Sequence, residues 1–522
     1  MQFRVGRLSA EAYKERKAGA GQTLTALGSY WKGRKPLILC RAVVLGCLLP
    51  GTDNPAKDLD IFLKLMAMDD RAFARRFGGT ANEFARLFPA WADLVTEEEG
   101  RRRVWRDDLD DHDRETRVAE AFASLPYSFD HRLKHVRRPE ECDQKFLLAE
   151  IWSDVNRHLG TYARSIPELA EQLGIARFGH RPKVADTFCG AGSIPFEAAR
   201  IGCDAYASDL NPIACMLTWG AFNIIGADEA TRTEIAKAQR KVAAAVEAEI
   251  TKLGIEHDAH GNRAKAYLYC LGTRCPKTGW MVPVASSWVI ATNRRIVAKL
   301  VPDHVAKRYR IVVQTDVSKA KMEEAAKGTL QNGRLVHPMN PERSGVEIKT
   351  IRGDYRNANG ISRNRLRLWE KSDFTPRPDD IWQERLYAIQ WITNTLDNVR
   401  PETFFAAVTD DDLARERKVE AIVAENLVSW QDEGLVPDMP IEPGDKTDEP
   451  IQTRGWTYWH HLFGARQLLF NSVALKHAKN YAALYTIFPK LLNRQSKLCC
   501  MTPETMPQRE SQRFRILFLT NH

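Results

Sequence analysis

The chain has 522 residues and a formal net charge of +9, with 44% hydrophobic and 27% charged residues. This balance is typical of a folded, water-soluble chain of two to four domains, and it excludes an intrinsically disordered or a membrane-embedded protein. The ten cysteines are scattered along the sequence, which excludes a small disulfide-stapled scaffold. The positive charge suits a polyanionic partner such as nucleic acid but does not by itself select one.

Residues 1–180 are predicted to be mostly helical, because apolar residues recur at three- and four-residue spacing in residues 55–77 and 150–174. The longest apolar run, residues 36–50, is interrupted by Arg41 and is too short to cross a bilayer, so we predict a buried helix there. The mixed charges of residues 97–117 predict a solvated helix face. The first residues do not have the pattern of a cleavable signal, and we expect a cytoplasmic location.

Residues 181–260 change to a pattern of strand, turn, helix, strand and helix. Residues 183–188 predict a buried parallel strand, and residues 193–202 predict a helix. Gly190 and Gly192 lie between them, where glycines allow the backbone to approach a ligand closely. The N-terminus of the helix that follows offers unpaired N–H groups to a carboxylate or a phosphate.

Two aspartates end the successive strands of this segment. Asp209 follows the second strand, 23 residues after Asp186, a separation that suits an acceptor for both hydroxyls of a ribose. Pro195 stands where a dinucleotide fingerprint requires its third glycine, and Asp186 suits a cofactor with a cationic amine. The segment therefore predicts a half-site for S-adenosylmethionine; the alternatives are a ligand-free turn and a nicotinamide-dependent oxidoreductase.

The remainder of the chain is predicted as a long amphipathic helix at residues 229–254, a β-rich insert at residues 261–352 and a helical region at residues 353–522. A Pro/Gly/Asp-rich loop at residues 434–455 interrupts the helical region. The adjacent histidines His460 and His461 are predicted to be packing or capping groups rather than metal ligands.

Four segments resemble the large adenine-specific DNA methylase-like proteins that carry an N-terminal domain of unknown function and often lie beside anti-phage defence genes. The segments are SYWKGRKPLILCRA (29–42), residues 151–224 around VADTFCGAGSIPFEAARIGCDAYASDLNP, DDIWQERLYAIQW (379–391) and RGWTYWHHLFGARQLL (454–469). The resemblance extends from about residue 9 to about residue 500. It implies an α/β fold with a Rossmann-like methyltransferase core that begins in residues 181–260, with S-adenosylmethionine as cofactor and double-stranded DNA as partner. The implied reaction is methyl transfer to an exocyclic amine of a base, with adenine N6 favoured and cytosine N4 as the second choice.

The matching motif carries over a set of cofactor-site positions: Asp186, Phe188, Gly190, Gly192, Asp209 and Asn211. The basic turn before residue 37 offers Lys32, Arg34 and Lys35 as candidates for phosphate contacts. A solvated turn with no ligand is the alternative for these three residues.

Residues 269–280 resemble half of a zinc ribbon, in which relatives carry Cys-Pro-x-Cys-Gly, but Thr278 occupies the place of the second cysteine. Cys270, Cys275 and His337 are weak candidate ligands, and three such groups fall short of the four that structural zinc requires. We therefore predict a metal-free remnant of a zinc-ribbon-like fold.

Amine methylation of a flipped base requires an Asp/Asn-Pro-Pro-Tyr/Phe motif in the resembled family, and the 522 residues contain no Pro-Pro dipeptide. Asp410 follows an apolar run but lacks both prolines and the ring, so it is predicted to cap a helix. We expect a truncated or frame-shifted methyltransferase with an incomplete sheet, inactive alone, in which a partner chain can supply the missing half. Residues 183–188 would then form an apolar sheet edge, which either another segment of this chain or a partner chain covers. The alternative is a non-catalytic DNA- or partner-binding scaffold within a defence complex.

Overall fold

The computed structural model describes residues 5–17, 27, 31, 33–98, 102–124, 129–339, 345–360, 362–393, 402–445, 447–497 and 517–520. The chain divides into two compact units, Met1–Arg232 and Thr233–His522. The first unit contains both the predicted helical region, residues 1–180, and the glycine turn. The second contains the predicted β-rich insert, residues 261–352, and the C-terminal region. The boundary between the two units therefore lies at residue 232, and not at the predicted boundaries near residues 180, 260 and 352.

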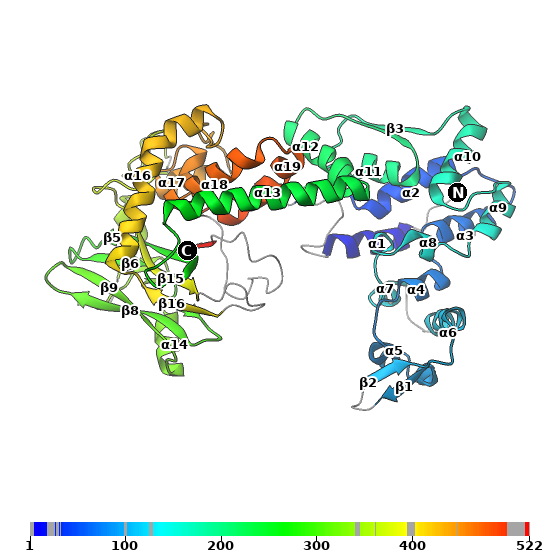
Figure 1. Ribbon diagram of the computed structural model, residues 1–522, viewed down its shortest axis with the longest axis horizontal. Helices are drawn as coiled ribbons and strands as arrows, with labels where there is room; N and C mark the ends of the chain where they lie inside the picture. Colours follow the sequence, from blue (N-terminus) through cyan, green and yellow to red (C-terminus); the bar gives the residue numbers. More distant parts are fainter. Residues whose placement is uncertain are drawn as a thin grey trace. The chain divides into compact units, whose positions relative to one another are not determined.

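Unit 1 begins with helices, which Figure 1 draws in blue and cyan. The elements before the glycine turn are α1 (Val5–Lys17), α2 (Leu37–Leu48), α3 (Pro55–Leu65), α4 (Asp70–Arg76), α5 (Ala81–Leu87), β1 (Val95–Glu98), β2 (Arg102–Trp105), α6 (Asp111–Ser124), α7 (Phe129–Leu133), α8 (Gln144–Leu147), α9 (Trp152–Leu159) and α10 (Ile166–Phe178). The apolar run at residues 36–50 forms α2, whose Leu37 and Leu45 are fully buried in the unit. The predicted buried helix is therefore confirmed.

The charged stretch at residues 97–117 is not one helix face, so this prediction is wrong in part. Its first half belongs to an antiparallel hairpin in which Glu97 pairs with Arg103 and Val95 pairs with Trp105. Its second half forms α6, which packs through Phe122 against the aromatic cluster of α4 and α5. Glu97 and Arg103 form an ion pair across the hairpin at 3.3 Å, a pairing that periodicity alone does not reveal.

The glycine segment forms β3 (Lys183–Asp186), α11 (Ser193–Ile201), β4 (Asp204–Ala207) and α12 (Pro212–Gly220), and one turn of π-helix follows (Ala221–Ile225). β3 and β4 pair in parallel as a sheet of two strands. The strand–turn–helix–strand order is as predicted, and a parallel pair requires such a crossover helix.

The small parallel sheet is covered on one face. Val184 and Ala205 pack against the core of α2, α10 and α11. On the other face Ala185 is exposed and Tyr206 is 56% exposed. The prediction of a buried strand at residues 183–188 is therefore wrong, because no described segment covers the second face, whereas parallel sheets are normally covered on both.

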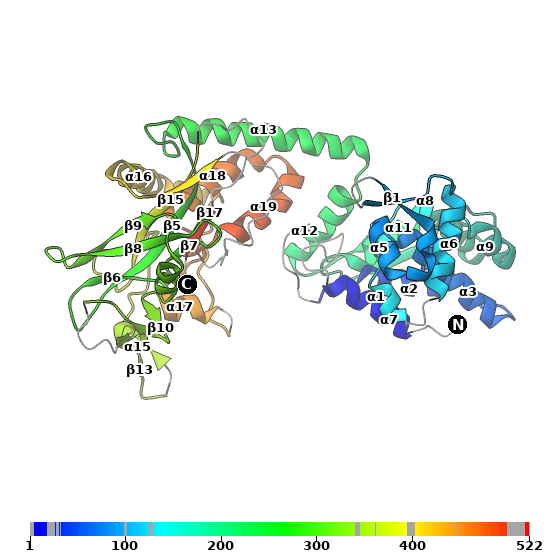
Figure 2. The same cartoon turned by 90° about the horizontal axis from the view of Figure 1, so that it is seen from below.

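Unit 2 is built on a mixed sheet of eight strands in the order β16-β15-β5-β6-β9-β8-β7, with β17 paired to β5. Figure 2 shows this sheet from below. The strands are β5 (Arg263–Arg274), β6 (Met281–Val284), β7 (Val289–Ala291), β8 (Ile296–Asp303), β9 (Arg308–Gln314), β15 (Gln383–Ile392), β16 (Thr403–Ala407) and β17 (Leu517–Thr520). The long β5–β15 ladder is antiparallel and has an irregularity at Tyr387, which places Leu386 opposite Tyr269 and Ala388 opposite Leu268.

The sheet corrects the prediction of a helical region at residues 353–522. β15 and β16 lie in this region and join the strands of the predicted insert in one sheet. Six consecutive residues of β15, Leu386–Trp391, include five buried hydrophobic side chains and Gln390. A strand buried on both faces has no polar alternation, and a short apolar run of this kind cannot be distinguished from a buried helix by periodicity.

The helices of unit 2 cover both faces of the sheet. They are α13 (Glu229–Leu253), α14 (Lys319–Ala326), α15 (Ile348–Arg352), α16 (Asp410–Asp432), α17 (Asp448–Arg454), α18 (Ala465–Ala478) and α19 (Ala482–Gln495), and short hairpin strands lie at β10 (Leu330–Gln331), β11 (Arg334–Leu335), β12 (Val346–Glu347), β13 (Tyr355–Arg356) and β14 (Ser362–Arg363). A core of α13, α16, α18 and α19 contains Val419, Val423 and Leu468. α14 packs against β8 on the opposite side of the sheet. The predicted long helix at residues 229–254 is confirmed as α13.

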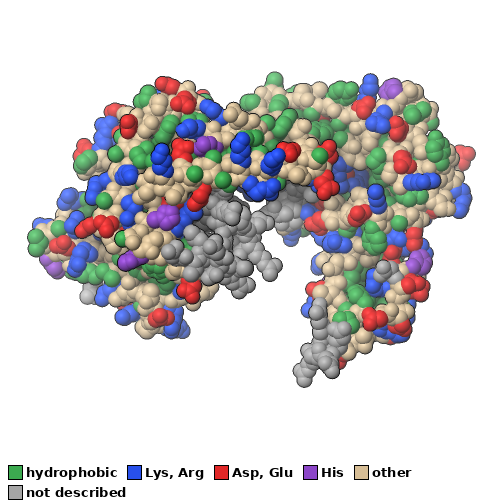
Figure 3. Space-filling view, in the orientation of Figure 1, with side chains coloured by type: hydrophobic (Ala, Val, Ile, Leu, Met, Phe, Trp, Pro, Cys, Tyr) green, Lys and Arg blue, Asp and Glu red, His purple; other side chains and the backbone are tan. Residues whose placement is uncertain are grey.

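Acidic and basic side chains are interspersed over each unit on the face drawn in Figure 3, so the positive charge is not gathered into one stripe on that face. Among the described residues, the helices are either too short or too polar to cross a bilayer. Thr409 caps α16 and forms a capping box with Asp412, with Asp410 as the first helical residue. The predicted helix start near Asp410 is thus confirmed, with the cap one residue earlier.

Candidate functional site

The two predicted carboxylates lie at the same edge of the small parallel sheet. Asp186 ends β3 and pairs in register with Ala207, two residues before Asp209. Backbone hydrogen bonds continue the ladder beyond the strands: the Ser208 N–H donates to the Asp186 carbonyl at 3.0 Å, and the Cys189 N–H donates to the Ser208 carbonyl at 3.0 Å. The turn after β3 and the residues after β4 therefore form one strand-end surface.

The turn requires its two glycines. Gly190 and Gly192 have φ angles of +51° and +74°, which L side chains rarely adopt. A Cβ atom on Gly192 would lie 2.7 Å from the Thr218 hydroxyl oxygen and 3.0 Å from the Thr218 Cα, and one on Gly190 would lie 2.9 Å from the indole nitrogen of Trp31. The loop is therefore held by α12 on one side and by the N-terminal segment on the other.

Asp209 connects the second strand to the glycine turn. Its Oδ2 accepts the Gly190 N–H at 2.9 Å, and its Oδ1 accepts the Asn211 N–H at 2.9 Å. The Asn211 and Gly190 N–H donors lower the pKa of Asp209, so the group is a carboxylate at neutral pH. Each carboxylate oxygen can accept about two hydrogen bonds, so both retain room for a ligand hydroxyl.

Asp186 and Phe188 lie on the first side of the turn. Asp186 Oδ1 accepts the Phe188 N–H at 3.1 Å, and its Oδ2 has no hydrogen bond to any described residue. The Phe188 ring is 78% exposed. The turn therefore presents one carboxylate oxygen and one aromatic ring at its surface.

Asn211 has a structural role in addition to its predicted one. Its side-chain oxygen accepts the Ile213 N–H at 2.9 Å and caps the N-terminus of α12. Beside it, Leu210 is 93% exposed and Ile213 is 47% exposed, although both are apolar. Neither residue belongs to the matched motif positions; the signal in the sequence for Leu210 is a bulky apolar residue directly after the strand-end aspartate.

The N-terminus of α11 faces the glycine turn without a side-chain cap, because Gly192 occupies the capping position. The first N–H groups of a helix have no partner within the helix, and they attract anions. α11 is held by Glu197, which is 1% exposed and binds Arg41 of α2 at 2.7 Å and Arg200 at 2.7 Å. Arg41, the charge that interrupts the apolar run, thus fixes the helix that carries the turn.

The N-terminal basic turn forms part of a pocket next to the glycine loop. The pocket between α1 and α2, which we call the α1–α2 pocket, has a volume of about 580 Å³. It is lined by Ser9, Ala12, Tyr13, Arg16, Trp31, Gly33, Arg34, Lys35, Pro36 and Leu39. Burial lowers the pKa of Arg34. Two of the three predicted phosphate-contact residues line this pocket, and the third, Lys32, lies outside the described residues.

The predicted zinc candidates do not form one cluster. Cys270 is buried on β5 in the core with Trp288 and Tyr387, whereas Cys275 is buried in a second core with Tyr309. His337 accompanies Tyr309: its Nδ1 lies 3.0 Å from the Tyr309 hydroxyl, and its Nε2 lies 3.4 Å from the Thr278 hydroxyl. In the described part of the chain, no three His, Cys, Asp or Glu side chains are placed to hold a metal ion.

The adjacent histidines are packing and capping groups, as predicted. His461 is fully buried; its Nδ1 accepts the Thr457 N–H at 3.1 Å and the Tyr458 N–H at 3.2 Å, and its Nε2 lies 3.0 Å from the Glu370 carbonyl. Burial and the neighbouring His460 lower the pKa of His461 to about 3. Burial also lowers the pKa of His460, whose Nε2 lies 3.1 Å from the Asp373 carbonyl, so both rings are neutral at neutral pH.

One protein-family model matches the N-terminal part of the chain. A family model described as a protein of unknown function, DUF1156, matches residues 2–65. The matched range contains α1, α2 and α3 together with the α1–α2 pocket. No curated protein and no solved structure matches the chain.

Proposed function

We propose that unit 1 binds S-adenosylmethionine at the strand-end surface of β3 and β4, as the cofactor-holding part of a Rossmann-like DNA amino-methyltransferase. The observation that carries this proposal is the position of Asp209 just after β4, where its two oxygens accept the N–H groups of Gly190 in the glycine turn and of Asn211. A strand-end acid beside a glycine turn and a helix N-terminus is the arrangement by which open α/β sheets bind nucleosides.

In this proposal each part of the surface holds one part of the cofactor. Asp209 accepts the ribose hydroxyls, the free oxygen of Asp186 accepts the ammonium group, and the first N–H groups of α11 bind the carboxylate. Leu210, exposed beside Asp209, provides apolar surface for the adenine ring. When bound, the cofactor supplies a methyl group on a sulfonium centre.

The groups that present the base are proposed to come from polypeptide outside these 522 residues, because the sequence has no Asp/Asn-Pro-Pro-Tyr/Phe motif. The face of the β3–β4 pair that the described residues leave uncovered supports this assignment, since parallel sheets are normally covered on both faces. Completed in this way, the protein methylates adenine N6 in duplex DNA, with cytosine N4 as the second choice.

Ligand-induced stabilisation tests the binding half of the proposal. Thermal unfolding of the full chain is followed with S-adenosylmethionine, S-adenosylhomocysteine or NAD⁺ at concentrations up to 1 mM. Binding to the folded state stabilises it by about 2.7 kcal/mol at a ligand concentration of one hundred times Kd. The proposal predicts stabilisation by the first two ligands; stabilisation by NAD⁺ alone, or by none of the three, contradicts it.

A second candidate function, DNA binding without catalysis, is favoured by the α1–α2 pocket, where Arg16, Arg34 and Lys35 lie beside the aromatic rings of Tyr13 and Trp31. Basic and aromatic groups together bind nucleic acid through phosphates and bases. Incubation of the chain with duplex DNA and cofactor labelled with tritium in the methyl group distinguishes the two candidates. Label in the DNA supports the methyltransferase, whereas salt-sensitive retention of unlabelled DNA supports the binding module.

A further inference from the structure

The α1–α2 pocket of unit 1 carries charge of one sign. Its charged lining residues are all basic: Arg16, Arg34 and Lys35. Two aromatic side chains, Tyr13 and Trp31, also line it, and no Asp or Glu of the described residues does. Its volume of about 580 Å³ lies in the range of about 300–1,000 Å³ that is typical of sites for small organic ligands. The lining therefore favours an anion with an aromatic body.

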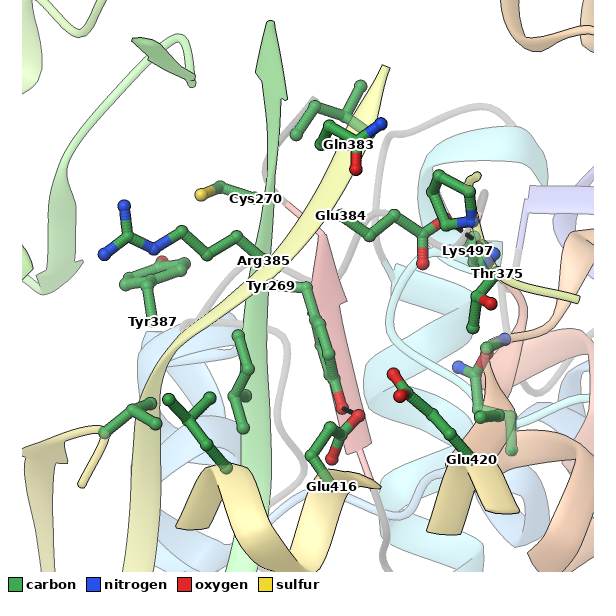
Figure 4. A pocket seen from close by; sticks show the side chains of 18 of the residues that line it. Tyr269, Cys270, Thr375, Gln383, Glu384, Arg385, Tyr387, Glu416, Glu420 and Lys497 are labelled. Atoms are coloured by element: carbon green, nitrogen blue, oxygen red, sulfur yellow. Dashed lines mark hydrogen bonds and ion pairs between the residues drawn. The ribbon is translucent and has the colours of Figure 1, made fainter. Parts of the chain in front are cut away.

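The pocket of unit 2 between the β5–β15 ladder and α16 has no such preference. Figure 4 shows acidic and basic side chains together on its walls. Three glutamates and four basic residues line it: Glu384, Glu416, Glu420, Arg385, Arg417, Arg454 and Lys497. Glu384 binds the Lys497 ammonium at 2.6 Å, and Glu416 binds Arg466 at 2.6 Å. Because acidic and basic groups compensate one another there, that lining does not select a ligand by its charge.

One side of α1 forms a wall of the α1–α2 pocket. Its lining residues recur at three- and four-residue spacing: Ser9, Ala12, Tyr13 and Arg16. The acidic residues Glu11 and Glu15 lie on the buried side of the helix, where they are 2% and 3% exposed. Glu11 binds Arg76 at 2.7 Å, and Glu15 accepts the Leu37 N–H at 3.1 Å at the start of α2. Both carboxylates therefore have partners in the core, and neither lines the pocket.

Arg34 and Lys35 supply another part of the wall, directly before α2. Burial lowers the pKa of Arg34, because its guanidinium is poorly hydrated, although the group remains charged at neutral pH. An anion beside such a cation forms charge-assisted hydrogen bonds, which are stronger than neutral ones. Arginine and lysine side chains are the usual partners of a phosphate group.

The two rings provide a surface on which a base can stack. Tyr13 is 59% exposed, and the Lys17 ammonium lies 4.5 Å from the centre of its ring. Trp31 reaches the glycine turn, since a Cβ atom on Gly190 would lie 2.9 Å from the indole nitrogen. Bases stack on aromatic side chains whatever their identity, because every base has a π-face. The pocket therefore combines phosphate-binding groups with a stacking surface, next to the proposed cofactor surface.

We propose that the α1–α2 pocket binds one nucleotide whose base is unpaired. The three basic side chains hold the phosphate, and the base stacks on the rings of Tyr13 and Trp31. A base inside a duplex is stacked between its neighbours, so it reaches the pocket only from a single strand, after flipping, or as a free nucleotide. The proposal rests on the second candidate function, nucleic-acid binding at this pocket, and specifies its ligand. It is independent of S-adenosylmethionine binding at β3 and β4.

Binding of thymidine 5′-monophosphate, compared with thymidine and with deoxyribose 5-phosphate, tests the proposal on the full-length chain. A pyrimidine nucleotide is the probe because it does not resemble the adenosyl group of the proposed cofactor. Isothermal titration at low salt is expected to give a Kd for the nucleotide in the submillimolar range, at least tenfold lower than the Kd for either half.

No binding of the nucleotide at 10 mM, or equal affinity for the nucleotide and one of its halves, overturns the proposal. If the chain then still retains duplex DNA in a salt-sensitive manner, the second candidate function stands and the nucleotide site alone is wrong. If it retains neither ligand, both are wrong.

Competition with single-stranded oligothymidylate identifies the source of the nucleotide. If the oligonucleotide displaces the mononucleotide, the pocket takes a nucleotide of a strand, and if it does not, the pocket takes a free nucleotide. The same strand paired with oligoadenylate is expected to compete at least tenfold less well, because its bases are paired. Equal competition by the duplex overturns the requirement for an unpaired base.

Two variants locate the contacts. In R34A/K35A the Kd for the nucleotide is expected to rise at least tenfold, whereas K319A/K321A, which removes the same charge from α14, keeps the wild-type Kd. In Y13L the Kd for the nucleotide is expected to rise at least fivefold, while the Kd for deoxyribose 5-phosphate stays unchanged. A wild-type nucleotide affinity in either R34A/K35A or Y13L, with the thermal unfolding temperature of the control, overturns the assignment.

Discussion

Asp209 accepts the backbone N–H of Gly190 at 2.9 Å, so that the acid at the end of the second strand holds the glycine turn that follows the first. The same carboxylate accepts the Asn211 N–H through its other oxygen. This connection makes the turn, the two strand ends and the start of α12 one structural element.

Replacement of Gly192 by alanine is expected to destabilise unit 1. The residue would have to adopt a φ of +74°, and its Cβ would lie 2.7 Å from the Thr218 hydroxyl and 3.0 Å from the Thr218 Cα. Strain of this kind costs about 1–3 kcal/mol, and the contact with Thr218 adds to it. Urea unfolding measures the loss.

The control for G192A is G179A. Gly179 has a nearly equal φ of +75°, but a Cβ there would have no atom within 4 Å. G179A therefore reports the backbone strain alone, about 1 kcal/mol. If both variants lose the same stability, the close approach of α12 to the turn is not what requires Gly192.

The ion pair of Arg41 and Glu197 is expected to be essential for the stability of unit 1. The two side chains are 5% and 1% exposed, and removal of Arg41 leaves the buried Glu197 carboxylate with Arg200 as its remaining cation. R41M is therefore expected to lose about 3 kcal/mol, the lower end of the range for a broken buried pair. R181M, which breaks the exposed pair of Arg181 and Glu171, is expected to lose less than about 1 kcal/mol. If the two variants lost similar free energies of unfolding, the buried pair would stabilise the unit no more than the exposed pair does.

Acid is expected to destabilise unit 2 through His461. Burial lowers its pKa from 6.5 to about 3, so the folded state holds the neutral ring while the unfolded chain binds a proton below pH 6.5. The stability is fully present above pH 6.5 and decreases by about 1.4 kcal/mol per pH unit below it, until the pH approaches 3. Denaturant unfolding between pH 7 and pH 5 measures this slope.

H461Q is expected to flatten that slope by about 1 kcal/mol per pH unit and to lower the stability at pH 7. The control is H260Q, because His260 is exposed on a turn of the same unit. H260Q should keep the wild-type slope. A wild-type slope in H461Q would mean that other groups cause the acid sensitivity.

The basic side chains of the α1–α2 pocket are expected to contribute to DNA affinity. If Arg34 and Lys35 contact phosphates, the double variant R34A/K35A weakens duplex binding and reduces the slope of log K against log salt by about 2. The variant K319A/K321A removes the same charge from α14 and should keep the slope. If both variants reduced the slope of log K against log salt equally, DNA binding would depend on the net charge of the chain and not on Arg34 and Lys35.

The strand–turn–helix–strand segment could be predicted from sequence because its determinants are local. Gly190, Gly192 and Asp209 specify a turn and a strand end within a short stretch, and the crossover geometry then brings the two strands together. The position of Trp31 against Gly190 could not be predicted, because it depends on packing between segments more than 150 residues apart.

Two elements differ from prediction for physical reasons. The sequence of β15 is typical of a buried helix, because its residues are buried on both faces of the sheet, which removes the alternation that marks a strand. The apolar sequence of β3 predicts a buried strand, but Ala185 is exposed since nothing in the described chain covers that face. The pocket of unit 2 that Tyr269 and Lys497 line has no local signal in the sequence, because its walls come from positions far apart in the chain.

The most direct test of the central claim is isothermal titration of S-adenosylmethionine into the wild-type chain and into D209N and D204N. Asp204 begins the same strand that Asp209 follows, so D204N is a matched control at the opposite end of β4. The account predicts binding to the wild type and to D204N with equal Kd, and a Kd at least tenfold higher for D209N, a loss of about 1.4 kcal/mol. Equal affinity of all three proteins, or no binding to the folded wild type, would contradict it.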